Sequence, residues 1–316
     1  MKAVALFSGG LDSILAVKLI QEQKIEVIGV SFISPFFGSR HAEKAAFHLR
    51  IPLKVIDLTE ELIRVIKKPK HGFGKNLNPC IDCRILMVKK AGEFMKESNS
   101  SFLVSGEVLG ERPMSQNKSS LRIIEEESGV ESYLLRPLSA KLLPPTIPEK
   151  ESWVDREKLL DLKGKSRKAQ LSLARKYNLK EFPAPSGGCL LTDPIYSQKL
   201  GKLLSLNSYS LRNDLDLLKY GRHFVLPSEA RIVVSRNQGE NEALSSLIQP
   251  DDYLLELKSI PSPLTLIRGK GINEEILHEA ARLTVKYSKA RELKTVEVSV
   301  RKSGMKEHVI LVETDK

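Results

Sequence analysis

Apolar residues in the first half of this chain follow two alternating patterns. Short, continuous apolar runs are typical of strands buried in a parallel sheet, and apolar residues three or four positions apart are typical of helices. The predicted strands span residues 3–7, 26–32, 53–58 and 101–105, and the predicted helices span 13–23, 40–50 and 83–96. This alternation predicts an α/β fold with a doubly wound parallel sheet.

The pattern changes in the second half. From about residue 206, short strands predominate, at 223–226, 231–234, 253–258, 264–268, 295–300 and 308–312, with helices at 241–248 and 273–289. We therefore predict two domains, an α/β domain over residues 1–205 and a smaller α+β domain over residues 206–316. Between the last α/β strand, at 133–136, and this second domain, four prolines within 137–148 predict a connector across the surface. Two helices, at 150–160 and 166–178, are predicted after it.

The turn after the first predicted strand carries the most specific motif, Ser8-Gly9-Gly10-Leu11-Asp12-Ser13. Glycines allow a sharp turn, and the unpaired amides at the start of the next helix suit a pyrophosphate, with Ser8 and Ser13 as hydroxyl donors. Asp12 suits a magnesium ion that bridges phosphate oxygens. The motif has neither Walker nor Gly-x-Gly-x-x-Gly spacing. In a doubly wound sheet, ligands collect at the carboxyl ends of the strands, so residues 8–13, 31–35 and 105–116 are expected to converge there.

Three cysteines stand in loop settings marked by Gly or Pro: Cys80 and Cys83 in a Cys-x-x-Cys pair, and Cys189 after Gly187 and Gly188. An odd number favours thiol chemistry or metal ligation over a disulfide framework. Three thiolates suit a [4Fe-4S] cluster with one open iron, or zinc if His71 supplies a fourth ligand. A persulfide on Cys189 that Cys83 resolves is a third reading, and a pair without chemical function a fourth.

The net charge of +11 indicates a polyanionic partner. Two stretches without acids concentrate the charge, at 64–75 and 163–180. With only 6% aromatic residues, contact with the phosphates of a folded RNA is favoured over base stacking along a single strand. The N-terminus reads as a strand and phosphate loop rather than a signal peptide, and no apolar run is long enough to span a membrane, so a cytoplasmic protein is expected.

The phosphate-loop motif resembles the signature of N-type ATP pyrophosphatases, which are adenine nucleotide alpha hydrolase-like. With the segment 105–116 and the cysteine pair, it resembles the PP-loop domain of tRNA 4-thiouridine synthetases. The segments 78–84, 164–177 and 186–189 resemble the tRNA 2-thiouridylases, and 220–227 with 230–242 resemble the NFACT-R RNA-binding module. The first two resemblances cover roughly residues 1–205.

The resemblance implies an ATP-dependent tRNA sulfurtransferase: adenylation of a uridine carbonyl oxygen, then sulfur transfer with release of AMP. Asp12, Cys83 and Cys189 would be catalytic, and Cys80 would add the third ligand of a [4Fe-4S] cluster. The implied ATP-binding residues are Ser8, Gly9, Gly10, Asp12, Ser13, Phe32, Gly106, Ser115 and Gln116, although Phe32 is equally a core candidate. The implied RNA-binding residues are Lys165, Arg167, Lys168, Arg175, Lys176 and Arg222.

Several points stay open. The chain begins directly at the phosphate loop, so the N-terminal tRNA-binding domain of 4-thiouridine synthetases is not expected, and the tail does not resemble the β-barrel of the 2-thiouridylases. The sequence leaves open which uridine is modified, whether the protein forms a homodimer, and whether sulfide, a cysteine desulfurase or a sulfur carrier donates the sulfur. The alternative functions are an ATP pyrophosphatase that forms an amide on a small molecule, and a non-catalytic RNA-binding factor.

Overall fold

The computed structural model describes residues 1–183, 188–206 and 211–314. Contacts between Cα atoms divide the chain into two compact units, Met1–Pro194 and Ile195–Lys316. This division falls before a helix, α8 (Pro194–Leu204), that the prediction grouped with the first domain. Among the described residues, no helix is both long and apolar enough to cross a bilayer.

The first unit contains a five-stranded sheet in the order β3-β2-β1-β4-β5, and every neighbouring pair is parallel. Its strands are β1 (Lys2–Leu6), β2 (Glu26–Ile33), β3 (Leu53–Asp57), β4 (Phe102–Ser105) and β5 (Leu134–Leu135). The strand order reverses direction from β1 to β4, which in such sheets opens a crevice at the carboxyl ends. The predicted doubly wound parallel sheet is confirmed.

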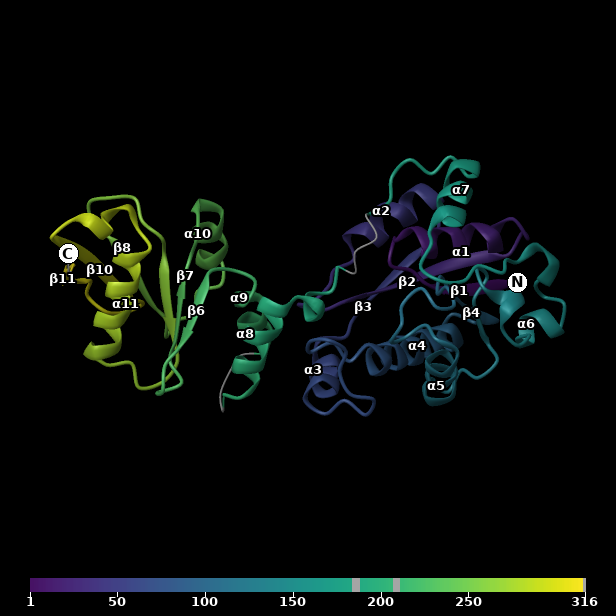
Figure 1. Ribbon diagram of the computed structural model, residues 1–316, viewed down its shortest axis with the longest axis horizontal. Coiled ribbons are helices and arrows are strands. Elements are labelled where there is room, and N and C mark those ends of the chain that lie inside the picture. The colour runs from purple at the N-terminus through teal and green to yellow at the C-terminus, as the bar shows by residue number, and fades with distance from the viewer. Residues whose placement is uncertain (184–187, 207–210, 315–316) are drawn as a thin grey trace. The chain divides into compact units, whose positions relative to one another are not determined.

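Helices cover both faces of this sheet (Figure 1). On one face lie α1 (Leu11–Gln21) and α2 (Arg40–Leu49), with α7 (Lys168–Lys176) packed against α1. On the other lie α3 (Thr59–Lys67), α4 (Cys80–Glu97) and α5 (Lys118–Ser128). The strands read as continuous apolar runs because both of their faces are buried: Val4 and Ala5, on opposite faces of β1, are both inaccessible to solvent.

The segment after β5 departs from the prediction. Leu138, Ala140 and Pro148 are buried and belong to the core, whereas Pro144 and Pro145 are exposed, so the stretch is a surface connector only in part. The predicted helix at 150–160 is also wrong, because α6 (Ile147–Lys150) ends early and Ser152 adopts a left-handed backbone with φ 57°.

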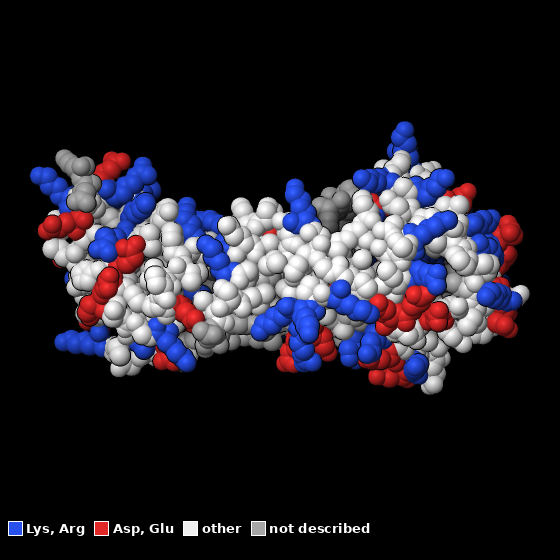
Figure 2. All heavy atoms as spheres, turned by 60° about the horizontal axis from the view of Figure 1, so that its bottom comes forward, with Lys and Arg blue, Asp and Glu red and all other residues white. Residues whose placement is uncertain are grey.

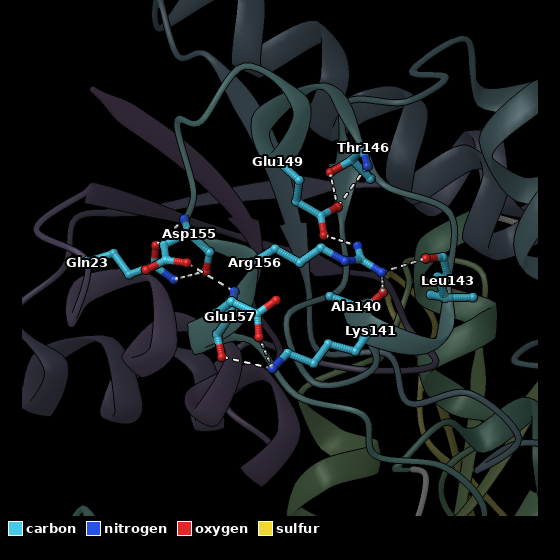
Figure 3. A network of polar contacts seen from close by, with 9 residues as sticks. All are labelled: Gln23, Ala140, Lys141, Leu143, Thr146, Glu149, Asp155, Arg156 and Glu157. Carbon is cyan, nitrogen blue, oxygen red and sulfur yellow. Dashed lines mark hydrogen bonds and ion pairs between the residues drawn. The ribbon is translucent and has the colours of Figure 1, made fainter.

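A polar network holds this segment in place (Figure 3). The buried Glu149 carboxylate accepts a hydrogen bond from the Thr146 amide and pairs with Arg156. The Arg156 guanidinium also donates to the carbonyl oxygens of Ala140 and Leu143, at 2.8 and 3.0 Å. These bonds tie the short 3-10 turn at Ala140–Leu142 and the residue after it to Arg156.

The second unit begins with α8 and α9 (Leu211–Leu217) and contains a six-stranded antiparallel sheet in the order β11-β10-β8-β9-β7-β6. The strands are β6 (Arg222–Val225), β7 (Arg231–Val234), β8 (Tyr253–Leu257), β9 (Thr265–Arg268), β10 (Thr295–Lys302) and β11 (His308–Glu313). The helix α11 (Glu274–Lys286) packs its apolar side on one face of the sheet, and α10 (Gln238–Ser245) contributes Leu244 to a smaller cluster that includes Val233. The predicted α+β module is confirmed.

Candidate active site

The loop between β1 and α1 is shaped by its glycines and serines. Gly9 has φ +72°, a conformation that a side chain disfavours, and a Cβ there would lie 2.2 Å from the carbonyl oxygen of His41. The Ser13 hydroxyl donates to the Gly10 carbonyl at 2.8 Å, and the Gly10 amide donates to Ser8 Oγ at 3.3 Å. No side chain caps the N-terminus of α1. Its first amides and positive dipole end therefore suit a bound anion.

The loop after β4 lies against this helix start. A Cβ on Gly106 would lie 2.6 Å from the carbonyl carbon of Asp12 and 2.6 Å from the amide nitrogen of Ser13, so only glycine allows this approach. Beyond it, Gln116 and Ser115 are buried, and the Gln116 side-chain oxygen accepts from the Arg112 amide at 3.0 Å. Segments 8–13 and 105–116 thus meet, as expected, with the Gln116 amide oxygen engaged in shaping the loop.

Asp12 is a partly buried carboxylate beside cations. Desolvation raises its pKa above the ordinary value, and the positive charges of Arg167 and Arg112 oppose this effect. The nearest cation is the Arg167 guanidinium, with Nη2 4.0 Å from Asp12 Oδ2. Within the described part of the chain, Asp12 Oδ1 is buried and has no hydrogen-bond partner. A buried carboxylate oxygen in this state is suited to a divalent cation, so the donor fits Mg²⁺.

The three cysteines form what we call the cysteine cluster: Cys80 and Cys83 in the first turn of α4, and Cys189 before a short turn at Leu190–Thr192. Two hydrogen bonds bring Cys189 to this place, from Asn76 Nδ2 to the Thr192 carbonyl at 2.7 Å and from the Leu190 amide to the Phe36 carbonyl at 3.0 Å. The loop after β2 therefore joins the site as well. Ser186 and Gly187, which precede Cys189 in the motif, lie outside the described residues.

The thiols of this cluster influence one another. Burial, and next the proximity of Cys189, raise the pKa of Cys83 to about 12. Burial also raises the pKa of Cys189 to about 11, while the charge of Arg112 lowers it. The charge of Arg112 lowers the pKa of both Asp12 and Cys189. Contacts link the two places: Arg84, next to Cys83, pairs with Glu107 at 3.1 Å, and the neighbouring Gly106 lies against the backbone of Asp12, so the phosphate loop and the cysteine cluster are neighbours.

The described residues contain no group of three His, Cys, Asp or Glu side chains placed to hold a single metal ion. His71 turns to Glu127, with Nε2 3.1 Å from Oε1, so it does not complete a zinc site with the cysteines. A [4Fe-4S] cluster is larger than one ion and takes three cysteine ligands, and the donor set fits it in number and chemistry.

A set of buried ion pairs that no local motif predicts lies next to the cysteines at the start of α4. Glu107 is fully buried between Arg84 and Arg136, at 3.1 and 2.9 Å, and these guanidinium groups keep the pKa of Glu107 below its ordinary value. The nearby Asp82 accepts from the amides of Lys70 and His71. Only the position of Glu107, directly after Gly106 in the loop motif, hinted at a role.

The remaining predicted residues fall in different places. Phe32 is buried at the end of β2, as a core residue would be. Lys165, Lys168, Arg175 and Lys176 are exposed, whereas Arg167 turns inward to Asp12. In the second unit, the Arg222 guanidinium lies over the Tyr287 ring, 4.4 Å from its centroid. On the face that Figure 2 shows, Lys and Arg are interspersed with Asp and Glu on both units.

Two family models match this chain. Residues 1–141 match the family described as thiamine biosynthesis protein (ThiI), and residues 221–315 match the NFACT protein RNA binding domain. The resemblances predicted from the motifs, to PP-loop tRNA thiolation enzymes and to the NFACT module, are therefore confirmed.

Curated relatives agree with the first match. A probable tRNA sulfurtransferase of Thermococcus kodakarensis is 31% identical over 149 residues, covering 43% of this chain and 36% of the relative. One from Anoxybacillus flavithermus is 26% identical over 198 residues, covering 51% and 49%. The chain thus spans half or less of the length of these relatives. Among solved structures, a 4-thiouridine synthetase in complex with RNA and bound ATP overlaps at 21% identity and a TM-score of 0.39, covering 69% of this chain and 52% of that one.

Proposed function

We propose that this protein is an ATP-dependent tRNA sulfurtransferase, which activates a uridine carbonyl oxygen with ATP and replaces it with sulfur. The observation that carries the proposal is the proximity of a phosphate loop and a cysteine cluster: Arg84, next to Cys83, pairs with Glu107, and the adjacent Gly106 lies against Asp12. The similarity of residues 1–141 to the ThiI family and of residues 221–315 to an RNA-binding domain supports tRNA as the substrate. In this proposal, the two domains, 1–205 and 206–316, supply chemistry and RNA binding.

The first step forms an adenylate. The uridine oxygen attacks the α-phosphorus of ATP, the bond to the bridging oxygen breaks, and pyrophosphate leaves. The Gly9–Gly10 turn and the first amides of α1 bind the pyrophosphate as its charge increases. Asp12 would hold a Mg²⁺ ion, which neutralises phosphate charge when bound.

The second step exchanges oxygen for sulfur. A sulfur nucleophile forms a bond to the activated carbon, and AMP leaves with the original uridine oxygen. We propose that Cys80, Cys83 and Cys189 ligate a [4Fe-4S] cluster, which supplies an open iron for a sulfide when bound. The raised pKa values of Cys83 and Cys189 keep the free thiols protonated at neutral pH, where they are weak nucleophiles. Metal ligation displaces those protons, which favours this arrangement over a free resolving thiolate.

The alternative route, through a persulfide, uses only two of the three cysteines. There the terminal sulfur of a Cys189 persulfide attacks the carbon, AMP leaves, and the Cys83 thiolate then attacks Cys189 Sγ. This releases the thiolated uridine and leaves a Cys83–Cys189 disulfide. Cys80 has no part in that sequence.

The test is anaerobic incubation of the full chain with tRNA, Mg-ATP, iron and a dithiol reductant, with sulfide as the sulfur source in one arm and a cysteine desulfurase with cysteine in the other, followed by mass spectrometry of the nucleosides. We expect thiolated uridine with the wild-type protein, and at least 100-fold less with Asp12→Ala or Cys189→Ser. Cys80→Ser is the discriminating variant in the desulfurase arm, where a persulfide can form: it loses activity there if the cluster is needed and keeps it if a persulfide on Cys189 is sufficient. Full activity of both Asp12→Ala and Cys189→Ser contradicts the proposed function.

A further inference from the structure

Buried polar groups without partners gather where α7 meets the start of α1. Gln170 is 1% exposed, yet neither atom of its side-chain amide completes a hydrogen bond within the described residues. The same holds for Arg167 Nε and Asp12 Oδ1, both buried. The Gln170 amide faces the Asp12 carboxyl closely enough to lower its pKa as a hydrogen-bond donor, yet without the geometry of a formed hydrogen bond. Three side chains from two helices thus present unsatisfied polar atoms at one place.

Packing alone does not account for these residues. The contact between the two helices is otherwise apolar, with Leu11, Leu15 and Leu19 of α1 against Ala174 of α7. Gln170 lies one turn before Ala174 on the same side of α7, where an apolar residue would continue this contact. Leaving a buried amide unpaired costs about 1–3 kcal/mol. Such a group in a native site points to a ligand that the protein binds.

The helix is placed beside the phosphate loop by a backbone bond. The Gly164 amide donates to the Leu109 carbonyl at 2.7 Å, which joins the segment before α7 to the loop after β4. Arg167 therefore enters the site from the same set of loops as Gly106. The opposite side of α7 carries Lys168, Arg175 and Lys176, all exposed.

We propose that Arg167 and Gln170 bind the polyphosphate of ATP, so that α7 forms a third wall of the nucleotide site. Without nucleotide, Arg167 neutralises Asp12. When ATP binds, the guanidinium turns to the phosphate oxygens, for which its planar pair of donors is suited, and Asp12 becomes free for Mg²⁺. The Gln170 amide nitrogen donates to a phosphate oxygen, and its oxygen accepts from a water. In this proposal Arg167 binds ATP and not RNA, the partner that the family resemblance implied for it. The inference rests on the proposed function only in taking ATP as the nucleotide.

The experiment compares two arginines of the same helix in the full chain. Mg-ATP binding is measured by calorimetry and tRNA binding by filter retention without ATP, for Arg167→Met, Gln170→Leu and the exposed control Arg175→Met. We expect Arg167→Met to raise the Kd for ATP at least 10-fold and to change that for tRNA less than 2-fold. Gln170→Leu raises the Kd for ATP about 3-fold or more. Arg175→Met leaves ATP binding unchanged.

The midpoint of urea denaturation, measured for each variant, shows whether a loss of ATP binding comes from a loss of folding. Gln170→Leu is expected to keep or raise the midpoint, because an apolar side chain of similar size replaces an unpaired amide. Loss of ATP binding in a protein of undiminished stability is a result that a merely structural role does not give. Unchanged ATP affinity in Arg167→Met overturns the inference, as does a wild-type chain that binds no ATP. A chain that binds ATP through Arg167 but never thiolates tRNA leaves the inference standing and contradicts the proposed function.

Discussion

At the scale of single residues, the site depends on glycines that let two loops approach. The backbone of Gly106 is not in the left-handed region, so its conformation does not require glycine. Glycine is needed there because a Cβ would collide with the neighbouring backbone. The end of β4 can therefore lie directly against the first turn of α1. The position of Asp12 is set by this contact, so Gly106 influences the nucleotide site without touching the nucleotide.

Gly106→Ala tests this contact. The added Cβ meets backbone atoms of Asp12 and Ser13 at 2.6 Å, and backbone cannot rotate away as a side chain can. We expect the free energy of unfolding to fall by about 1–3 kcal/mol, as in other overpacked sites, and ATP binding to weaken. The measurements are urea denaturation of the first unit's transition and calorimetry with Mg-ATP.

The matched control is Gly38→Ala, since Gly38 lies in a turn near α2 and a Cβ there meets nothing within 4 Å. Its effect should stay within about 1 kcal/mol and can be stabilising, because alanine restricts the unfolded chain. Equal urea midpoints for the two variants would show that the approach of β4 to α1 is not tight.

At the scale of elements, the apolar pattern was sufficient to predict a strand where both of its faces are buried. The strands β1, β2 and β4 were predicted to within a few residues for this reason, and the partly exposed edge strand β3 was predicted equally closely. The helix α5 was missed because only Leu121, Ile124 and two serines are buried among its charged residues. Its capping residues were the available signal: the Asn117 side chain accepts from the Ser120 amide, and Gly129 ends the helix with φ 70°.

The candidate site was predictable where its residues belong to a local motif. Ser8 to Ser13 form one turn, and Cys80 with Cys83 share one helical turn, so spacing alone grouped them. Gln170 gave no such signal. Its role depends on the packing of α7 against α1, which lies some 150 residues earlier in the chain, and no local spacing records that contact.

The strand β6 carries a partly buried histidine, His223, that should make folding depend on pH. Burial, and next the positive charge of Lys199, lower the pKa of His223 to about 3, and its Nε2 lies 2.8 Å from the Tyr220 carbonyl oxygen. An unfolded chain restores the ordinary pKa of about 6.5. Between these values the unfolded state binds a proton that the folded state does not, so stability is full above pH 6.5 and falls as the pH is lowered toward 3.

We expect His223→Gln to reduce this loss, because glutamine cannot be protonated and can still donate to the Tyr220 carbonyl. Between pH 7 and 4.5, the wild-type transition of the second unit should lose on the order of 2 kcal/mol more than that of the variant. Urea denaturation at several pH values measures the difference. His308→Gln, at an exposed position of β11, is the control and should follow the wild type. Parallel pH profiles for all three proteins would contradict the buried neutral imidazole.

At the scale of the whole molecule, net charge does not say where RNA binds. The chain carries +11, but both signs are mixed over the face seen in Figure 2. In the first unit, basic residues lie at both ends of the sheet. Lys163, Lys165 and Lys168 lie at or just before the start of α7, where Arg167 reaches Asp12, while Lys2, Lys24 and Lys54 lie at or just before the opposite, N-terminal ends of β1, β2 and β3. Arg175 and Lys176 lie at the other end of α7, next to Tyr177, whose hydroxyl donates to Glu22 just after α1.

If tRNA must reach the site, the exposed lysines around the start of α7 should contact its phosphates and the opposite end of the sheet should not. We therefore expect the variant with Lys163, Lys165 and Lys168 all changed to Gln to bind tRNA more weakly. It should also lower the slope of log Kd against log salt by about 2–3, because each lost phosphate contact releases roughly one counterion fewer. The variant with Lys2, Lys24 and Lys54 changed to Gln loses the same charge and should keep the wild-type slope. Filter binding of tRNA to the three full-length proteins between about 50 and 200 mM salt measures both slopes. Equal slopes for the two triple variants would mean that the attraction comes from overall charge, and the contact assigned to α7 would then be wrong.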